Sequence, residues 1–177
     1  SMQGGMYADA IESFDEVERQ HPYSSWATRA KLMGAYCHYL SSNYDDAILG
    51  LDRFIQLHPS NKDVAYAMYL KGLSFYEQFS DVTRDQKITE FALNSFKELI
   101  ARFPESKYSQ DAKVKLDLAQ DHLAGKEMEI GRYYHSKHQY LAAINRFRKV
   151  IENYQTTTHV PEALHRLTEA YISLGIL

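Results

Sequence analysis

Residues 44–59 read YDDAILGLDRFIQLHP, and this stretch contains the pattern that decides the fold. The small residue Ala47 is followed by Leu51 four positions later and by Phe54 seven positions later. These three side chains share one face of an α-helix, because positions i, i+4 and i+7 lie on the same side. Pro59 lacks an N–H group and disfavours helix for the residue before it, so it stops the helix. We therefore predict an amphipathic helix whose small residue allows a neighbouring helix to approach closely.

The same spacing occurs four times along the chain. The small anchors and the large residues that follow them are Ala10, Phe14 and Val17; Ala47, Leu51 and Phe54; Ala92, Phe96 and Leu99; and Ala143, Phe147 and Val150. The position twelve residues after each anchor holds Pro22, Pro59, Pro104 and, breaking the pattern, Gln155. Eight residues beyond each of these lies another alanine: Ala30, Ala67, Ala112 and Ala163. Small, large and then proline is typical of the second half of a tetratricopeptide (TPR) repeat. We predict an all-α, TPR-like α-α superhelix, which is a solenoid of antiparallel helix pairs.

From the repeat we predict that residues 1–177 form a single solenoid. Its approximate pairs are 1–22 (second helix only), 23–59, 60–104, 105–155 and 156–177 (first helix only). Helices are expected near residues 5–20, 24–41, 44–58, 62–78, 86–103, 107–137, 139–154 and 160–174. The sixth is long, and Gly125 and Gly131 either kink it or divide it in two. Because both terminal pairs are incomplete, we expect exposed apolar surface at both ends of the solenoid.

Composition supports a folded helical protein and excludes several other classes. Hydrophobic residues make up 45% and charged residues 24% of the chain, which argues against disorder. The formal net charge of −3 gives no basic footprint for nucleic acid. No apolar run approaches the roughly 18 residues that a membrane helix needs. Cys37 is the single cysteine, so no internal disulfide can form, and we expect it to be a small apolar residue inside a helix.

Four stretches, together with the repeat, resemble the BamD (ComL) family of outer-membrane lipoproteins. They are residues 48–59 with their DRFI core, residues 66–73 (YAMYLKGL), residues 103–108 (FPESKY) with the following Asp111 and Ala112, and residues 131–146 (GRYYHSKHQYLAAINR). They occur in the family's order and cover almost the whole chain. No single stretch is diagnostic, so the ordered set carries the resemblance.

The resemblance implies a scaffold at the periplasmic face of the bacterial outer membrane, without enzymatic activity. It implies a lipidated cysteine upstream of Ser1, so that the chain would be a soluble truncation whose only membrane contact is that anchor. It implies two partners: the POTRA region of the barrel-forming protein BamA, and C-terminal signals of unfolded outer-membrane proteins. Residues 79–86 form a shorter insert than in some family members, and helices are missing at both ends, so contacts made by those parts do not carry over.

Tyrosine is unusually frequent, and its spacing predicts a peptide groove. In the TPR frame, the second, fifth, ninth and twelfth positions of each first helix point into the concave groove. In the second and third pairs these positions hold Arg29, Leu32, Tyr36, Tyr39, Tyr66, Tyr69, Leu73 and Tyr76. Tyrosine offers a broad apolar face and a hydroxyl at low rotamer cost, which suits peptide recognition. Our hypothesis is a groove for an extended, aromatic-rich peptide, with Arg29 available to a carboxylate. The alternative is that the tyrosines only pack between neighbouring helices.

A different partner is expected in the fourth pair, where the same positions hold Gly125, Met128, Arg132 and His135. In the BamD family an arginine of the alanine-rich helix contacts BamA, and the matching residue is Arg146. Its neighbours Asn145, Arg148 and Lys149 complete a surface suited to an acidic protein. The alternative is an ordinary solvated helix face.

Two other functions compete with this reading. A different periplasmic TPR adaptor of the cell envelope would show the same periodicity without binding POTRA domains. A metal-dependent hydrolase could use His135 and His138, but neither an HExxH motif nor a cysteine pair supplies further ligands. No nucleophile or phosphate-binding motif is present, so we expect no catalytic residues, no metal and no cofactor.

Overall fold

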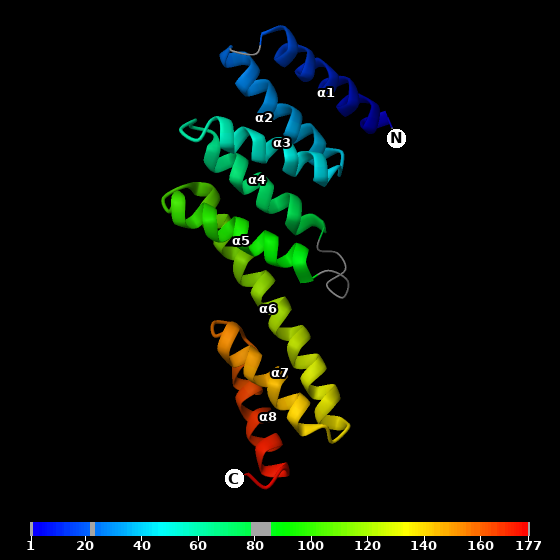
Figure 1. The fold of residues 1–177 in the computed structure, drawn as a ribbon, viewed down its shortest axis with the longest axis vertical. Coiled ribbons are helices and arrows are strands. Elements are labelled where there is room, and N and C mark those ends of the chain that lie inside the picture. Colours follow the sequence, from blue (N-terminus) through cyan, green and yellow to red (C-terminus); the bar gives the residue numbers. More distant parts are fainter. Residues whose placement is uncertain (1, 22–23, 79–85, 177) are drawn as a thin grey trace. The chain divides into compact units, whose positions relative to one another are not determined.

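The computed structural model describes residues 2–21, 24–78 and 86–176, and within these ranges it contains eight helices and no strand (Figure 1). They are α1 (Met2–Gln20), α2 (Ser25–Leu40), α3 (Tyr44–Leu57), α4 (Val64–Glu77), α5 (Gln86–Arg102), α6 (Lys107–Ser136), α7 (Tyr140–Asn153) and α8 (Val160–Ser173). The all-α, TPR-like prediction is therefore confirmed. The predicted linker at residues 79–86 lies outside the described residues, except that α5 begins at Gln86.

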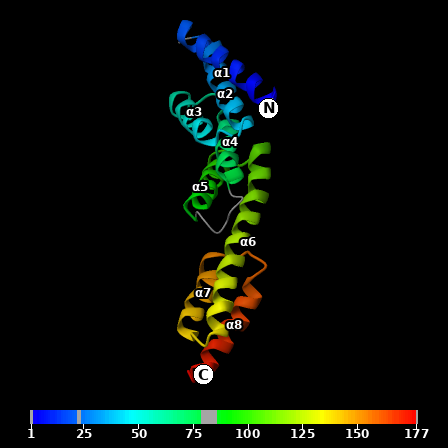
Figure 2. The ribbon, with the colours of Figure 1, turned by 90° about the vertical axis from the view of Figure 1, so that its right-hand side faces the viewer.

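Two compact units divide the chain after Lys113, so that α6 begins in the first unit and continues through the second. In the first unit each helix from α1 to α5 packs on the next one along the chain. In the second unit α7 and α8 lie against the remainder of α6, as Figure 2 shows from the side. The single solenoid over residues 1–177 stays a prediction, and the units are described separately.

The predicted apolar stripes form the core of the first unit. Ala47, Leu51, Ala92, Phe96 and Leu99 are fully buried, with no exposed surface. The first copy is different, since Ala10, Phe14 and Val17 on α1 are only half-buried. Helix α1, the first described helix, packs mainly on α2.

The second unit repeats the arrangement with its own core. Ala143, Phe147 and Val150 of α7 pack with Ala124 and Met128 of α6, and Ala163 of α8 joins them. Tyr134, Ile151 and Leu167 pack against this cluster from its edges. The anchor alanine therefore has the same role in both units.

Helix α6 is one uninterrupted helix of 30 residues, so the division considered at its glycines does not occur. Gly131 is buried, and a Cβ added there would lie 2.5 Å from Cε1 of Phe147. The glycine therefore permits close approach of α7 and is not a helix break.

Large apolar side chains are exposed near both ends of the described chain and also between them, as at Leu57 and Leu141, so they do not single out the two ends. Met6 and Trp26 expose 71% and 72% of their surface, and Ile172 and Ile176 expose 60% and 62%. Among the described helices, none is both long enough and apolar enough to span a bilayer.

Candidate binding surfaces

Four tyrosines of the first unit form a connected cluster across α2, α4 and the start of α6. The ring centroids of Tyr36 and Tyr66 lie 6.4 Å apart, and those of Tyr66 and Tyr108 lie 5.3 Å apart. Tyr69 stacks on Tyr108 with centroids 5.5 Å apart. We call Tyr36, Tyr66, Tyr69 and Tyr108 the tyrosine cluster; all four side chains are half-buried, so each keeps part of its surface at the solvent.

Two hydroxyl groups of this cluster, those of Tyr66 and Tyr69, have a raised pKa. Burial, together with the charges of Tyr36 and Tyr108, raises the pKa of Tyr66 to about 12. Burial and a hydrogen bond donated to the Asp111 carboxylate raise the pKa of Tyr69 as well. Tyr66 therefore stays a neutral phenol that can donate to a backbone carbonyl of a bound peptide, whereas the Tyr69 hydroxyl already donates its proton to Asp111.

The other predicted groove residues differ from one another in their contacts and in their exposure. Tyr39 packs on Tyr44 of α3, with centroids 5.9 Å apart, and Tyr76 packs on Phe96 of α5 at 6.2 Å. Leu73 is half-buried and Arg29 is exposed. Leu32 contributes less surface than predicted, because only 6% of its surface is exposed. Packing between helices, the alternative reading, thus accounts for part of the set.

Two residues of this surface, Tyr108 and Asp111, were missed by the groove prediction. The sequence does contain a signal for them. Asp111 directly precedes Ala112, as Tyr66 precedes Ala67 and Arg29 precedes Ala30. The prediction applied the groove positions only to the later part of α6, around Gly125, although the helix begins at Lys107.

Trp26 and Arg29 stand between two hollows at the start of α2. One hollow has a volume of about 620 Å³ and is lined mainly by apolar side chains, including Phe14, Val17 and Met33. The other, of about 440 Å³, is lined by polar groups that include Lys62 and Asp63. An exposed guanidinium beside an apolar hollow suits a ligand with both a carboxylate and an apolar side chain.

The predicted partner surface on α7 contains cations that are already paired. Arg146 donates from Nη1 to Oε2 of Glu127 on α6 at 3.0 Å, and Lys149 Nζ lies 2.6 Å from Oε1 of the same residue. Arg148 pairs with Glu152 one turn along α7, at 3.1 Å. Asn145 is exposed. Each of the three cations therefore has an acidic partner within the chain.

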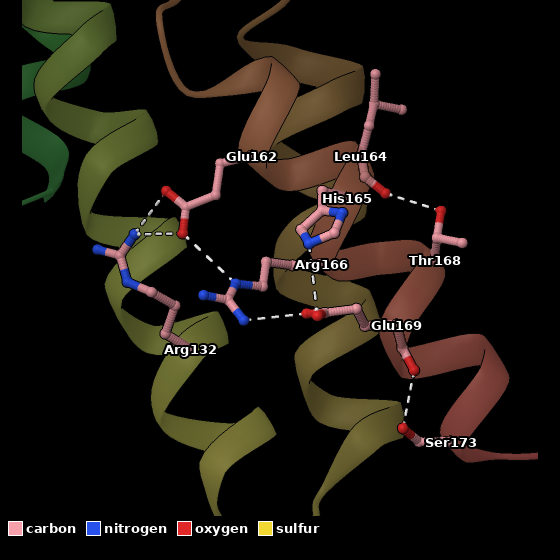
Figure 3. Close-up of polar contacts among 8 residues, drawn as sticks. All are labelled: Arg132, Glu162, Leu164, His165, Arg166, Thr168, Glu169 and Ser173. Carbon is pink, nitrogen blue, oxygen red and sulfur yellow. Dashed lines mark hydrogen bonds and ion pairs between the residues drawn. The ribbon is translucent and has the colours of Figure 1, made fainter.

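A second charged network joins α6 to α8 (Figure 3). Arg132 Nη1 donates to both oxygens of Glu162, at 3.1 and 3.0 Å. Arg166 lies between Glu162 and Glu169, and its Nη1 donates to Glu169 at 3.0 Å. Burial alone would raise the pKa of Glu162, but the hydrogen bonds and charges of Arg132 and Arg166 outweigh it, so that pKa is lowered.

The Arg132–Glu162 ion pair lies at the same repeat positions as the Tyr36–Tyr66 ring pair of the first unit. Arg132 is at the ninth frame position of its helix, as Tyr36 is, and Glu162 precedes Ala163 as Tyr66 precedes Ala67. The first helices of two successive helix pairs are thus joined by an aromatic contact in the first unit and by an ion pair in the second. The remaining predicted positions add little surface, because Met128 is fully buried and His135 packs on Tyr140.

The histidines of the hydrolase alternative have aromatic neighbours. The His135 ring lies 5.3 Å from the Tyr140 ring, and His138 Nδ1 lies 2.8 Å from the Tyr140 hydroxyl. Within the described residues, no group of three or more His, Cys, Asp or Glu side chains is arranged to hold a metal ion.

Successive helix pairs with small residues packed on large ones, found in both units, define a TPR-like helical-repeat protein. A family model described as YfiO, outer membrane lipoprotein, matches residues 1–177. The chain belongs to this family, which confirms the resemblance found in the sequence.

Curated relatives carry the name outer membrane protein assembly factor BamD. The protein of Caulobacter vibrioides is 51% identical over 97% of this chain, and that of Rickettsia prowazekii is 50% identical over 96%. The protein of Neisseria meningitidis serogroup A is 36% identical over 96% of this chain. The matched part is 56% of the Caulobacter protein, 68% of the Rickettsia protein and 67% of the Neisseria protein.

Proposed function

We propose that this chain is a non-enzymatic scaffold of outer-membrane protein assembly, acting at the periplasmic face of the outer membrane. The first unit binds extended C-terminal segments of unfolded outer-membrane proteins. The second unit binds the POTRA region of BamA through the face of α7 that carries Asn145, Arg146 and Arg148. The names of the relatives support the assembly role, and the two surfaces supply the candidate contacts.

The tyrosine cluster is the observation that carries the peptide-binding part of the proposal. Its rings come from three different helices, yet each lies within 6.4 Å of another member. Half-exposed rings of this kind give contact area, and their hydroxyls can form hydrogen bonds, without the cost of ordering long side chains. Arg29 adds a cation for the terminal carboxylate of the peptide.

The test is a titration of the chain with a synthetic C-terminal peptide of an outer-membrane β-barrel protein. The double variant Tyr36→Ala with Tyr69→Ala should weaken binding by roughly tenfold or more, since two aromatic contacts of about 1 kcal/mol each are lost. Tyr133→Ala is the matched control, because Tyr133 is 60% exposed and belongs to the second unit. Unchanged affinity of a folded double variant would refute the groove.

Arg146→Glu tests the other surface. The reversed charge would face Glu127 and the acidic partner at once, so binding to a purified POTRA region should be lost. Far-UV circular dichroism checks that the helices remain. Retained binding would remove Arg146 from the interface, and a chain that binds neither peptide nor POTRA region would favour the other periplasmic adaptor.

A further inference from the structure

Glu127 is a nearly buried carboxylate that no predicted surface includes. Its side chain is 9% exposed, whereas those of Arg146 and Lys149 are 38% and 32% exposed. The two cations take different oxygens of the carboxylate, Arg146 at Oε2 and Lys149 at Oε1. One acidic group of α6 therefore holds two basic groups of α7, which lie three positions apart on the same helix face.

The Glu127 carboxylate stays charged at neutral pH. Burial alone would raise the pKa of Glu127, but the hydrogen bonds and charges of Lys149 and Arg146 outweigh it and lower that pKa. A carboxylate with so little exposure is costly to leave without its cations, because water cannot replace them fully. An acidic partner is therefore expected to add to this arrangement and not to displace Glu127.

The arrangement leaves donors available on the exposed side. A guanidinium has five N–H groups and an ammonium has three, and Glu127 accepts one from each. The Arg148–Glu152 pair is different, because both side chains are more than half exposed and both belong to α7. Such a pair holds neither member in a fixed position.

We propose that Glu127 is a positioning residue, which fixes Arg146 and Lys149 as a pre-organised pair of donors for a carboxylate on an acidic partner surface. The inference rests on the proposed binding of BamA and names how the α7 surface is prepared for it. Pre-organisation raises affinity because the long side chains are ordered before the partner arrives.

The experiment measures binding of the full chain to a purified BamA POTRA region. Glu127→Gln keeps the shape of the side chain and removes its charge, and it should weaken binding by roughly tenfold. Glu127→Asp keeps the charge but shortens the reach, and it should also weaken binding. Glu162→Gln is the matched control, since it breaks another interhelical carboxylate–arginine pair of the same unit, and it should bind like the original chain.

A double background separates positioning from a general effect on the fold. In a chain that carries Arg146→Ala and Lys149→Ala, adding Glu127→Gln should change affinity by less than about twofold, because the residues through which it acts are gone. Thermal unfolding shows whether each variant is folded, and Glu127→Asp serves if Glu127→Gln is not.

The outcomes distinguish this inference from the function on which it rests. Unchanged or tighter binding by the two Glu127 variants would overturn positioning, and tighter binding would identify Glu127 as a competitor of the partner carboxylate. A further loss of affinity in the double background would also overturn it. If the Arg146→Ala, Lys149→Ala chain binds as tightly as the original, the proposed BamA contact itself fails.

Discussion

Gly72 on α4 faces the ring of Phe96 on α5 so closely that an added Cβ would lie 2.5 Å from Cε1 of the ring. Gly131 and Phe147 repeat this relationship in the second unit, with the same distance. Both phenylalanines are large residues that follow an anchor alanine by four positions, and both are fully buried. The missing Cβ therefore lets the two helices of a pair approach each other in both units.

Gly72→Ala should destabilise the protein by about 1–3 kcal/mol. A methyl group at Gly72 overlaps the ring, and Phe96 has no exposed surface into which it could move. This strain exceeds the gain of about 1 kcal/mol that alanine brings to a helix interior. Urea denaturation followed by circular dichroism measures the change.

Gly34→Ala is the control for that substitution. A Cβ at Gly34 would lie 3.8 Å from Cβ of Phe14, which is an ordinary contact. Only the helix propensity remains, so this variant should be up to about 1 kcal/mol more stable. Equal effects of the two substitutions would show that the ring contact at Gly72 does not limit packing.

The stability of the second unit should depend on the charge of Glu127. Its pKa is lowered in the folded state, so its ion pairs contribute fully above the ordinary value of 4.5 and are lost as pH falls through the lower, folded value. Glu127→Gln should therefore be about 1–3 kcal/mol less stable than the original chain at pH 7, with a smaller difference at pH 3. Denaturation midpoints at several pH values test this, and a difference independent of pH would contradict it.

Much of the fold could be predicted because the signal is local. An anchor alanine, its large partners and a proline all lie within one helix, so their spacing alone places the buried stripe. Ala92, Phe96 and Leu99 follow this rule and are fully buried. At Gly131 the sequence suggested a kink or a division of the helix, since spacing does not reveal that Phe147 packs against this glycine.

The candidate sites depend on contacts between distant residues, which the spacing of residues within one helix does not predict. Glu127 meets Arg146 and Lys149 across 19 and 22 positions of sequence. Tyr69 meets Asp111 across 42 positions, on a helix whose start was not treated as part of the groove. Such contacts follow from how helices pack, so the sequence indicated the cationic residues of α7 but not their shared carboxylate.

His138, in the turn between α6 and α7, should tolerate glycine better than alanine. Its φ angle of 57° lies in the left-handed region, which costs a residue with a Cβ about 1 kcal/mol. Both substitutions remove the contact with the Tyr140 hydroxyl, so the difference between them reports the backbone alone. At the exposed, mid-helix position Glu129 the order should reverse, with alanine more stable by about 1 kcal/mol. The same order at both positions would contradict a strained turn.

Tyr69→Phe should separate the hydrogen bond to Asp111 from the ring contacts. The phenyl ring can keep its stacking on Tyr108, whereas the hydroxyl donor is lost, which costs about 0.5–1.5 kcal/mol of stability. Because burial and the Asp111 hydrogen bond raise the pKa of Tyr69 above its ordinary value of 10, this contribution is complete at neutral pH. It should shrink as pH rises above 10, where the hydroxyl of the unfolded chain ionises, and it is lost as pH rises through the higher folded-state pKa. Tyr133→Phe, at an exposed ring, is the control. Equal losses of stability in both variants would mean that the bond to Asp111 adds nothing to the fold.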